Sequence, residues 1–223
     1  MYNFKFEPDK CWYKDICENE CSSSCLRYLE MDYLMKTSNI PEKCQYPVSL
    51  IPEEQDLEAF NILADIKDDI VNFVNNGENL YIFSNNFGNG KTTWSIKLMC
   101  NYFNLVWAGN GFRRRGLFIN VPTFLTRLKN NISNYDSELN EIKKYLTEVD
   151  LVIWDDIGSG KLSDFDHTNL LSYIDERILK NKSNIYTSNL NYEQLIKCVG
   201  NRIASRIINS NCTYIELVGG DRR

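Results

Sequence analysis

One loop constrains this chain more than any other feature of its sequence. It spans residues 85–92, between an apolar stretch at residues 80–83 that predicts a buried strand and a helix expected over residues 92–103. The loop ends in three residues that match the phosphate-binding pattern G-x-x-x-x-G-K-[ST], namely Gly90, Lys91 and Thr92. Asn85 stands where the pattern has its first glycine. Because asparagine adopts a left-handed backbone more readily than most residues, we expect the loop to tolerate it.

This loop predicts a site for ATP. Backbone N–H groups at the start of a helix point toward a bound phosphate, and the helix dipole favours the same negative charge. We expect Lys91 to reach the β- and γ-phosphates and the Thr92 hydroxyl to ligate Mg²⁺. A turn that contains Gly and Lys by chance is the alternative, and the strand–loop–helix context disfavours it. The residues expected to contact the nucleotide are Asn85, Gly88, Asn89, Gly90, Lys91, Thr92 and Thr93.

Strands and helices alternate along the chain beyond about residue 54. Apolar runs predict strands at residues 80–83, 117–121, 151–154, 183–187 and 213–217. Apolar residues at helical spacing predict helices at about residues 60–74, 92–103, 122–128, 167–179 and 192–208. This order predicts an α/β fold, with a mostly parallel sheet flanked by helices on both faces.

Two carboxylates follow the third predicted strand. Residues 151–154 are apolar throughout, and Asp155 and Asp156 come directly after them. The carboxyl ends of parallel strands face the ligand crevice. We therefore expect Asp155 to bind Mg²⁺, directly or through water, and Asp156 to act as general base toward the attacking water. Asn189, after the next strand, is expected to contact the γ-phosphate or position that water, with a helix cap as the alternative.

Basic residues gather at two places. Arg202 and Arg206 are four residues apart, so they share one face of a predicted helix. The planar, permanently charged arginine fork suits a γ-phosphate, and an arginine supplied by a neighbouring subunit would couple hydrolysis to assembly. A solvated helix face with acidic partners is the alternative. Residues 112–115 join one Phe to three Arg, which suits single-stranded DNA and equally a solvated turn.

The start of the chain is acidic and rich in cysteine. The first 60 residues hold six Lys or Arg against twelve Asp or Glu, a balance unsuited to holding DNA by itself. Cys17, Cys21 and Cys25 repeat at i, i+4 and i+8, which would place them along one helix face. We expect a structural zinc site, with an iron–sulfur cluster or no metal as alternatives. The four expected ligands are Cys11, Cys17, Cys21 and Cys25.

These patterns predict the domain organisation. A cysteine-rich module that docks a partner is expected at residues 1–46, a linker at 47–54 and an ATPase domain at 55–223. The apolar runs are shorter than the roughly 18 residues of a membrane span, and the first residues lack the apolar stretch of a signal peptide. We therefore expect a cytoplasmic protein that does not enter a membrane.

Further motifs accompany the loop and the acidic pair in a fixed order. They are residues 151–158, 175–177, 187–190, 200–206 and 219–223. Together with the phosphate loop, they resemble the DnaC/DnaI-type helicase loaders and the related IstB transposition helpers, all of them AAA+ ATPases. The resemblance covers roughly residues 55–223. It implies that Lys91 and Thr92 bind ATP and Mg²⁺, that Asp155 and Asp156 are the acidic pair, and that Asn189 is the first sensor.

The resemblance also implies partners. Arg202 or Arg206 would be the trans-acting arginine finger, and Arg222 is a candidate for the second sensor. ATP-dependent homo-oligomers would bind single-stranded DNA and deliver a replicative hexameric helicase, with slow turnover before assembly. Some DnaI-type loaders grip the helicase through an N-terminal zinc module, which suggests the same role for residues 1–46. The alternatives are an IstB-like transposition helper on duplex DNA and a small-molecule P-loop kinase, and short loader-like chains are compatible with phage replication modules.

Overall fold

Five strands form one parallel sheet in the computed structural model, which describes residues 4–18, 20–46 and 48–221. The strands are β1 (Asn79–Phe83), β2 (Gly116–Asn120), β3 (Leu151–Asp155), β4 (Ser183–Ser188) and β5 (Cys212–Glu216). Their order across the sheet is β2-β3-β4-β1-β5, and every neighbouring pair is parallel. β1, β3 and β4 are buried along their whole length, as expected for central strands of a parallel sheet that is covered on both faces. The predicted α/β fold is confirmed.

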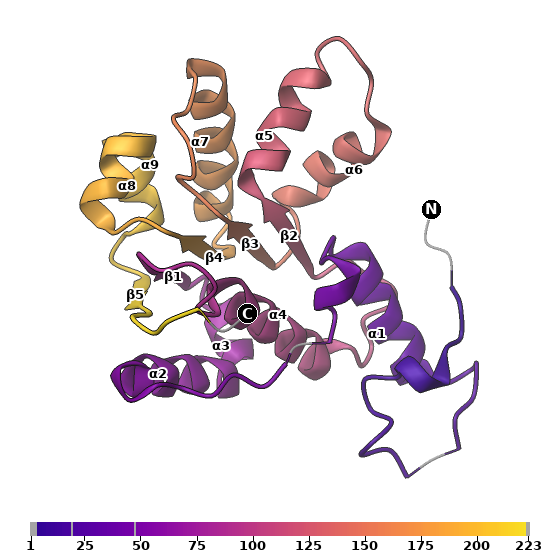
Figure 1. The fold of residues 1–223 in the computed structure, drawn as a ribbon. Coiled ribbons are helices and arrows are strands. Elements are labelled where there is room, and N and C mark those ends of the chain that lie inside the picture. Colours follow the sequence, from indigo (N-terminus) through magenta and orange to yellow (C-terminus); the bar gives the residue numbers. More distant parts are fainter. Residues whose placement is uncertain (1–3, 19, 47, 222–223) are drawn as a thin grey trace.

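Helices cover both faces of this sheet (Figure 1). Successive side chains of a strand point to opposite faces, so the sheet has a hydrophobic core on each face. Leu80 and Ile82 of β1 belong to the core on one face, with a first group of helices, and Tyr81 and Phe83 belong to the core on the other face, with a second group. The first group is α1 (Leu26–Thr37), α2 (Leu57–Asp68), α3 (Ile70–Asn75) and α4 (Lys91–Val106). The second group is α5 (Val121–Asn130), α6 (Ser137–Leu146), α7 (Asp164–Leu179), α8 (Tyr192–Val199) and α9 (Asn201–Ile207). Three 3-10 turns, η1 (Pro8–Lys10), η2 (Glu42–Cys44) and η3 (Glu54–Asp56), lie in the first quarter of the chain.

Two predicted helices are each divided in the structure. The helix expected over residues 60–74 breaks at Asp69, which has φ −106° and ψ 23° and accepts a hydrogen bond from the Asn72 side chain. The helix expected over residues 192–208 breaks at Gly200, whose φ of 83° and ψ of 153° separate α8 from α9. α6 was not predicted at all. Its N-terminus is capped by the Asp136 carboxylate, which accepts the Leu139 N–H.

The first 46 residues share a core with α4. Tyr13, Met31, Leu34 and Met35 belong to the same buried cluster as the apolar side chains of α4 and β1. The guanidinium of Arg27 lies 3.4 Å from the centre of the Tyr13 ring. α1 therefore packs on the nucleotide-binding part of the chain, and the boundaries at residues 46 and 54 stay a prediction.

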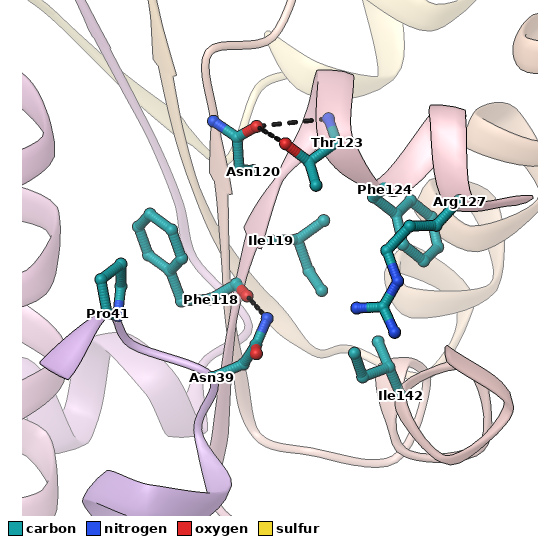
Figure 2. A pocket seen from close by; sticks show the side chains of 9 residues that line it. All are labelled: Asn39, Pro41, Phe118, Ile119, Asn120, Thr123, Phe124, Arg127 and Ile142. Atoms are coloured by element: carbon teal, nitrogen blue, oxygen red, sulfur yellow. Dashed lines mark hydrogen bonds between the residues drawn. The ribbon is translucent and has the colours of Figure 1, made fainter. Parts of the chain in front are cut away.

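The outer edge of β2 is closed by residues that follow α1 (Figure 2). The Phe118 N–H donates to the Ser38 carbonyl (2.7 Å), and the Asn39 side chain donates to the Phe118 carbonyl (3.0 Å). Asn39 has a left-handed backbone (φ 62°), which turns the chain at this point. A cavity of about 150 Å³ beside this contact is lined by Pro41, Phe124 and other side chains of α5 and β2. Strand edges that offer unpaired backbone groups recruit other strands, so this contact protects the sheet.

Among the described residues, no helix has the length and apolar character needed to cross a membrane.

Candidate functional site

The phosphate loop turns at two glycines rather than at Asn85. Gly88 has φ 72°, and Gly90, the N-cap of α4, has φ 99°. Asn85 is not among the described residues with positive φ, so the loop accommodates it without a left-handed backbone at this position. The chain continues the direction of β1 past Phe83, since the Ser84 N–H donates to the Ser188 carbonyl, and a glycine is therefore not required at position 85.

Lys91 is held inside the loop. Its side chain is almost fully buried, and its ammonium donates to the Asn86 carbonyl (3.0 Å) and to the Asn89 side-chain oxygen (3.2 Å). Asn89 is itself fully buried, and its amide donates to the Ser84 hydroxyl and to the Leu217 carbonyl. The cation is thus fixed at the start of α4 by its own loop, where the N-terminal end of the helix also favours an anion.

Asp155 joins the phosphate loop to the end of β4. One oxygen of its buried carboxylate accepts hydrogen bonds from the Thr92 hydroxyl (2.7 Å) and from the Thr187 hydroxyl (2.8 Å). The predicted pair of Mg²⁺ ligands, Thr92 and Asp155, is therefore in direct contact. Thr187 was not assigned from the sequence. Its sequence signal is only its place at the end of the fourth predicted strand, since the pairing of β3 with β4, which sets it beside Asp155, is seen only in the structure.

Asp156 has a left-handed backbone, with φ 59°, which is rare for a residue with a side chain. Its N–H donates to the Thr187 hydroxyl (3.1 Å), so the same threonine holds both members of the acidic pair. Burial raises the pKa of Asp156, the neighbouring Asp155 raises it further, and Lys91 opposes both effects. A carboxylate with a raised pKa that faces a cavity is suited to accept a proton.

One open cavity of about 520 Å³ brings the predicted residues together. That volume lies within the range of roughly 300–1,000 Å³ that is usual for small-molecule sites. It is lined by Cys44, Phe87, Gly88, Asn89, Gly90, Lys91, Thr92, Thr93, Asp156, Ser159 and Asn189. Cys44, Phe87 and Ser159 were not predicted. Phe87 lies in the loop and Ser159 follows the acidic pair, whereas no sequence signal points to Cys44. Asn85 and Asp155 do not line this cavity, and Asp155 is connected to it through its hydrogen bond with Thr92.

Arg202 and Arg206 do not line this cavity. Both lie on α9, where the Arg206 guanidinium donates to the Asp175 carboxylate of α7 (2.6 Å) and Arg202 is exposed. Their placement on one helix face is as expected, and neither can serve the nucleotide site of its own chain from there. Arg222 lies outside the described residues.

The predicted zinc site is not formed. Within residues 4–18, 20–46 and 48–221, no three or more Cys, His, Asp or Glu side chains are arranged to hold a metal ion. Cys17 and Cys21 are exposed, Cys11 packs against the core, and Cys25 is the N-cap of α1. The shared helix face expected for Cys17, Cys21 and Cys25 is wrong, because the described residues between them are not helical and α1 begins only at Leu26.

The arginines of residues 112–115 are engaged within the chain. Arg113 and Arg115 pair with the Asp150 carboxylate (3.0 and 2.9 Å), and Arg114 pairs with Glu141. Lys182 also pairs with Asp150. These contacts hold the loop before β2 against the loops before β3 and β4. They favour a structural role for the basic run over the contact with single-stranded DNA.

Thr187→Val should remove the hydrogen bonds that connect the acidic pair to β4. Valine keeps the volume but removes the hydroxyl that donates to Asp155 and accepts from Asp156. Removing a side chain that hydrogen-bonds a metal ligand typically weakens metal affinity about 10- to 100-fold. We therefore expect the Mg²⁺ concentration for half-maximal ATP hydrolysis to rise about 10- to 100-fold. Magnesium titrations of Thr187→Val and Thr187→Ser provide the measurement. The serine variant keeps the hydroxyl and should recover most of the loss, and equal losses in both variants would contradict the proposed role.

Comparison with known protein sequences identifies similar proteins. A model of the family described as IstB-like ATP binding protein matches residues 53–211. The replicative helicase loader DnaC of Escherichia coli strain K12 is 24% identical over 135 residues, which cover 60% of this chain and 52% of DnaC. This chain therefore matches about half the length of that curated relative.

Solved structures share the fold at low sequence identity. The crystal structure of DnaI is similar with a TM-score of 0.62 and 20% identity, covering 85% of this chain and 99% of that one. The replication initiator DnaA, bound to AMPPCP and single-stranded DNA, gives a TM-score of 0.58 and 19% identity, covering 78% of this chain and 50% of that one. At these identities the likeness concerns the fold.

Proposed function

The chain belongs to the family of IstB-like ATP binding proteins and has the α/β fold of AAA+ P-loop NTPases, and we propose that it hydrolyses ATP to load a replicative ring helicase onto single-stranded DNA. One observation supports the ATPase part most directly. The Lys91 ammonium, the Asp156 carboxylate and the Asn189 amide line the same cavity, at the carboxyl ends of parallel strands. This arrangement provides a positive charge for a phosphate, a base for water and a polar side chain in the same cavity.

The side chains at the loop fit ATP with Mg²⁺. The Thr92 hydroxyl and the Asp155 carboxylate are 2.7 Å apart and are both oxygen ligands, the kind that Mg²⁺ prefers. Lys91 supplies the positive charge next to the N-terminus of α4. When bound, Mg²⁺ would neutralise charge that develops on the phosphates. Thr92 and Asp155 would hold it, and Lys91 would hold the β- and γ-phosphates.

Asp156 is the proposed general base. Its raised pKa makes it a better proton acceptor than an ordinary aspartate, and it would take the proton from a water that attacks the γ-phosphate. Asn189 lines the same cavity and would orient that water. Asp155 would stay on the metal side of the site, so the two carboxylates would have different roles.

Arg202 and Arg206 are proposed to act on the nucleotide of a neighbouring subunit. Neither lines the cavity of its own chain, and Arg202 is exposed on α9. A permanently charged fork added at the γ-phosphate would raise turnover only after assembly. We therefore propose an ATP-dependent homo-oligomer with slow hydrolysis at low protein concentration.

The proposed partners follow from the relatives. DnaC is named a replicative helicase loader, and the DnaA structure contains single-stranded DNA. We propose a hexameric replicative helicase as the protein partner and single-stranded DNA as the nucleic acid. The acidic region before residue 60 would suit contact with a basic protein surface rather than with phosphates.

Lys91→Ala tests the nucleotide site and the loader role together. We expect the affinity for a fluorescent ATP analogue to fall about 100-fold or more, because a buried phosphate loses its charged hydrogen-bond donor. Lys97→Ala is the matched control, since Lys97 lies on the same helix with its ammonium near the Trp94 ring. Unchanged affinity in Lys91→Ala would contradict the site.

Helicase loading provides the second measurement. Wild-type protein, the replicative helicase of the source organism and circular single-stranded DNA are incubated with ATP, and bound helicase is counted after gel filtration. We expect loading with wild type and with Lys97→Ala, and none with Lys91→Ala. No association with the helicase under any nucleotide condition, together with ATP-dependent coating of duplex DNA, would replace the loader by a transposition helper.

A further inference from the structure

The chain passes beside the phosphate loop again after β5. Residues 217–220, the post-β5 segment, run along the loop and offer it their carbonyl groups. The Leu217 carbonyl accepts from the Asn89 amide (3.0 Å), and the Val218 carbonyl accepts from the Asn86 amide (2.8 Å). Asn86 and Asn89 are two of the residues that the general phosphate-loop pattern leaves unspecified. In this chain both serve to bind the post-β5 segment.

η3 holds the same segment from its other side. The Asp56 carboxylate is fully buried and accepts the N–H groups of Val218 (2.7 Å) and Gly219 (3.1 Å). Glu53 accepts the Gly220 N–H (3.1 Å). Asp56 is fully buried and accepts two backbone N–H groups, whereas Glu53 is exposed and accepts one, so Asp56 is the stronger of the two anchors. The carbonyl side of the segment thus faces the loop, and the amide side faces η3.

The two asparagines also determine where the Lys91 ammonium lies. In the loop, the ammonium donates to the Asn86 carbonyl and to the Asn89 side-chain oxygen. The amide groups of the same two residues are fixed by the post-β5 segment. A continuous set of hydrogen bonds therefore leads from Asp56 through the post-β5 segment and the asparagines to Lys91.

We propose that the post-β5 segment is a structural part of the nucleotide site, and that Asp56, Asn86 and Asn89 are positioning residues for Lys91. The inference rests on the proposed binding of ATP, and it adds Asp56 and Asn86, which do not line the cavity, to Asn89, which does. Asp56 fixes the segment, and the segment fixes the two asparagine side chains. The Asn86 backbone carbonyl and the Asn89 side-chain oxygen then hold the ammonium beside the place of a phosphate. Binding of a phosphate would in turn order the segment, because coupling between two sites is reciprocal.

Asp56→Asn tests this coupling with little change in shape. The asparagine places an N–H₂ group against the N–H groups of Val218 and Gly219 and removes the negative charge. In nucleotide-free protein, we expect faster amide hydrogen exchange at residues 217–220 and also at residues 86–90 of the phosphate loop. We expect the Kd for AMPPCP to rise about 5- to 20-fold, within the usual range of coupling between sites.

Two further variants keep the proposal testable if Asp56→Asn does not fold. Asn86→Ala changes an exposed side chain, keeps the backbone carbonyl that accepts from Lys91, and should raise the Kd for AMPPCP in the same direction. Asp69→Asn is the matched control, because Asp69 is an exposed aspartate at the break between α2 and α3. It should leave both exchange and affinity unchanged.

The outcomes separate this proposal from the proposed function. If Asp56→Asn speeds exchange at residues 217–220 alone and leaves residues 86–90 as in wild type, the coupling is overturned whatever the nucleotide does. An unchanged Kd in both Asp56→Asn and Asn86→Ala would overturn it as well. If wild type fails to bind AMPPCP, the ATP site is wrong, while exchange in the nucleotide-free variants still decides whether the loop and the segment are coupled.

Discussion

Asp156→Asn should bind ATP as well as wild type and hydrolyse it about 10² to 10⁴ times more slowly, the usual contribution of a general base. Asparagine has nearly the same shape, and its backbone can keep the left-handed conformation seen at this position. It cannot accept the proton of the attacking water. Phosphate release in single-turnover conditions and the affinity for a fluorescent ATP analogue together provide the measurement.

The stability of this variant gives an internal control. The fold raises the pKa of Asp156 above its ordinary value of 3.8, so the folded state binds this proton more tightly than the unfolded state. Proton binding by Asp156 therefore contributes to the free energy of unfolding at low pH, and this contribution is lost as pH rises through the raised pKa. Asparagine does not ionise, and we expect Asp156→Asn to be at least as stable as wild type at pH 7. Slow hydrolysis in a stable protein would assign the defect to chemistry, whereas hydrolysis at the wild-type rate would remove Asp156 as the base.

The same shift predicts the pH dependence of the wild-type rate. Hydrolysis should decline as pH falls through the raised pKa of Asp156, and the midpoint should lie above 3.8. The decline should be absent from the residual rate of Asp156→Asn. A wild-type profile with its midpoint at or below the ordinary value would contradict the assignment.

Arg177→Met should reduce the free energy of unfolding by about 3–5 kcal/mol, because each buried acceptor left without a donor costs roughly 1–3 kcal/mol. Arg177 is fully buried, and burial lowers the pKa of its guanidinium. All of the hydrogen bonds that its guanidinium donates go to uncharged oxygens. They are the carbonyls of Leu146, Val149, Asp150 and Ser183 and the side chain of Asn184. Methionine fills the space and leaves these acceptors unpaired.

Thermal unfolding provides the measurement for this variant. A domain of this size changes its Tm by roughly 2–4 °C for each kcal/mol, so the expected decrease is well above experimental error. Arg202→Met is the matched control, since it replaces an exposed arginine and should change stability by less than about 0.5 kcal/mol. Equal Tm values for the two variants would show that the Arg177 network contributes little to stability.

Local patterns were sufficient for the strands and for much of the site. The five strands contain short apolar runs, and the pattern is clearest in β3, which is buried along its whole length and apolar from Leu151 to Trp154. Lys91, Asp156 and Asn189 could be placed at one edge of the sheet, because parallel strands end at the same side. Their roles in hydrolysis stay predictions.

Other features depend on contacts between distant segments. Thr187 supports the acidic pair only because β4 lies beside β3, and the sequence does not state the order of strands. The break at Gly200 results from one backbone conformation that a helical pattern does not reveal. α6 was missed although Leu139, Ile142 and Leu146 have helical spacing, since its cap at Asp136 follows a loop without a clear boundary. The cysteine spacing suggested a helix face that the backbone does not form.

The contact that closes the edge of β2 has a consequence for synthesis of the chain. Asn39 precedes its partner Phe118 by 79 residues, and proteins are made from the N-terminus onward. The group that closes the edge therefore leaves the ribosome well before the strand it protects. When β2 emerges, its open row of amides and carbonyls can be covered within the same nascent chain, which reduces pairing with chains on neighbouring ribosomes of the same messenger RNA.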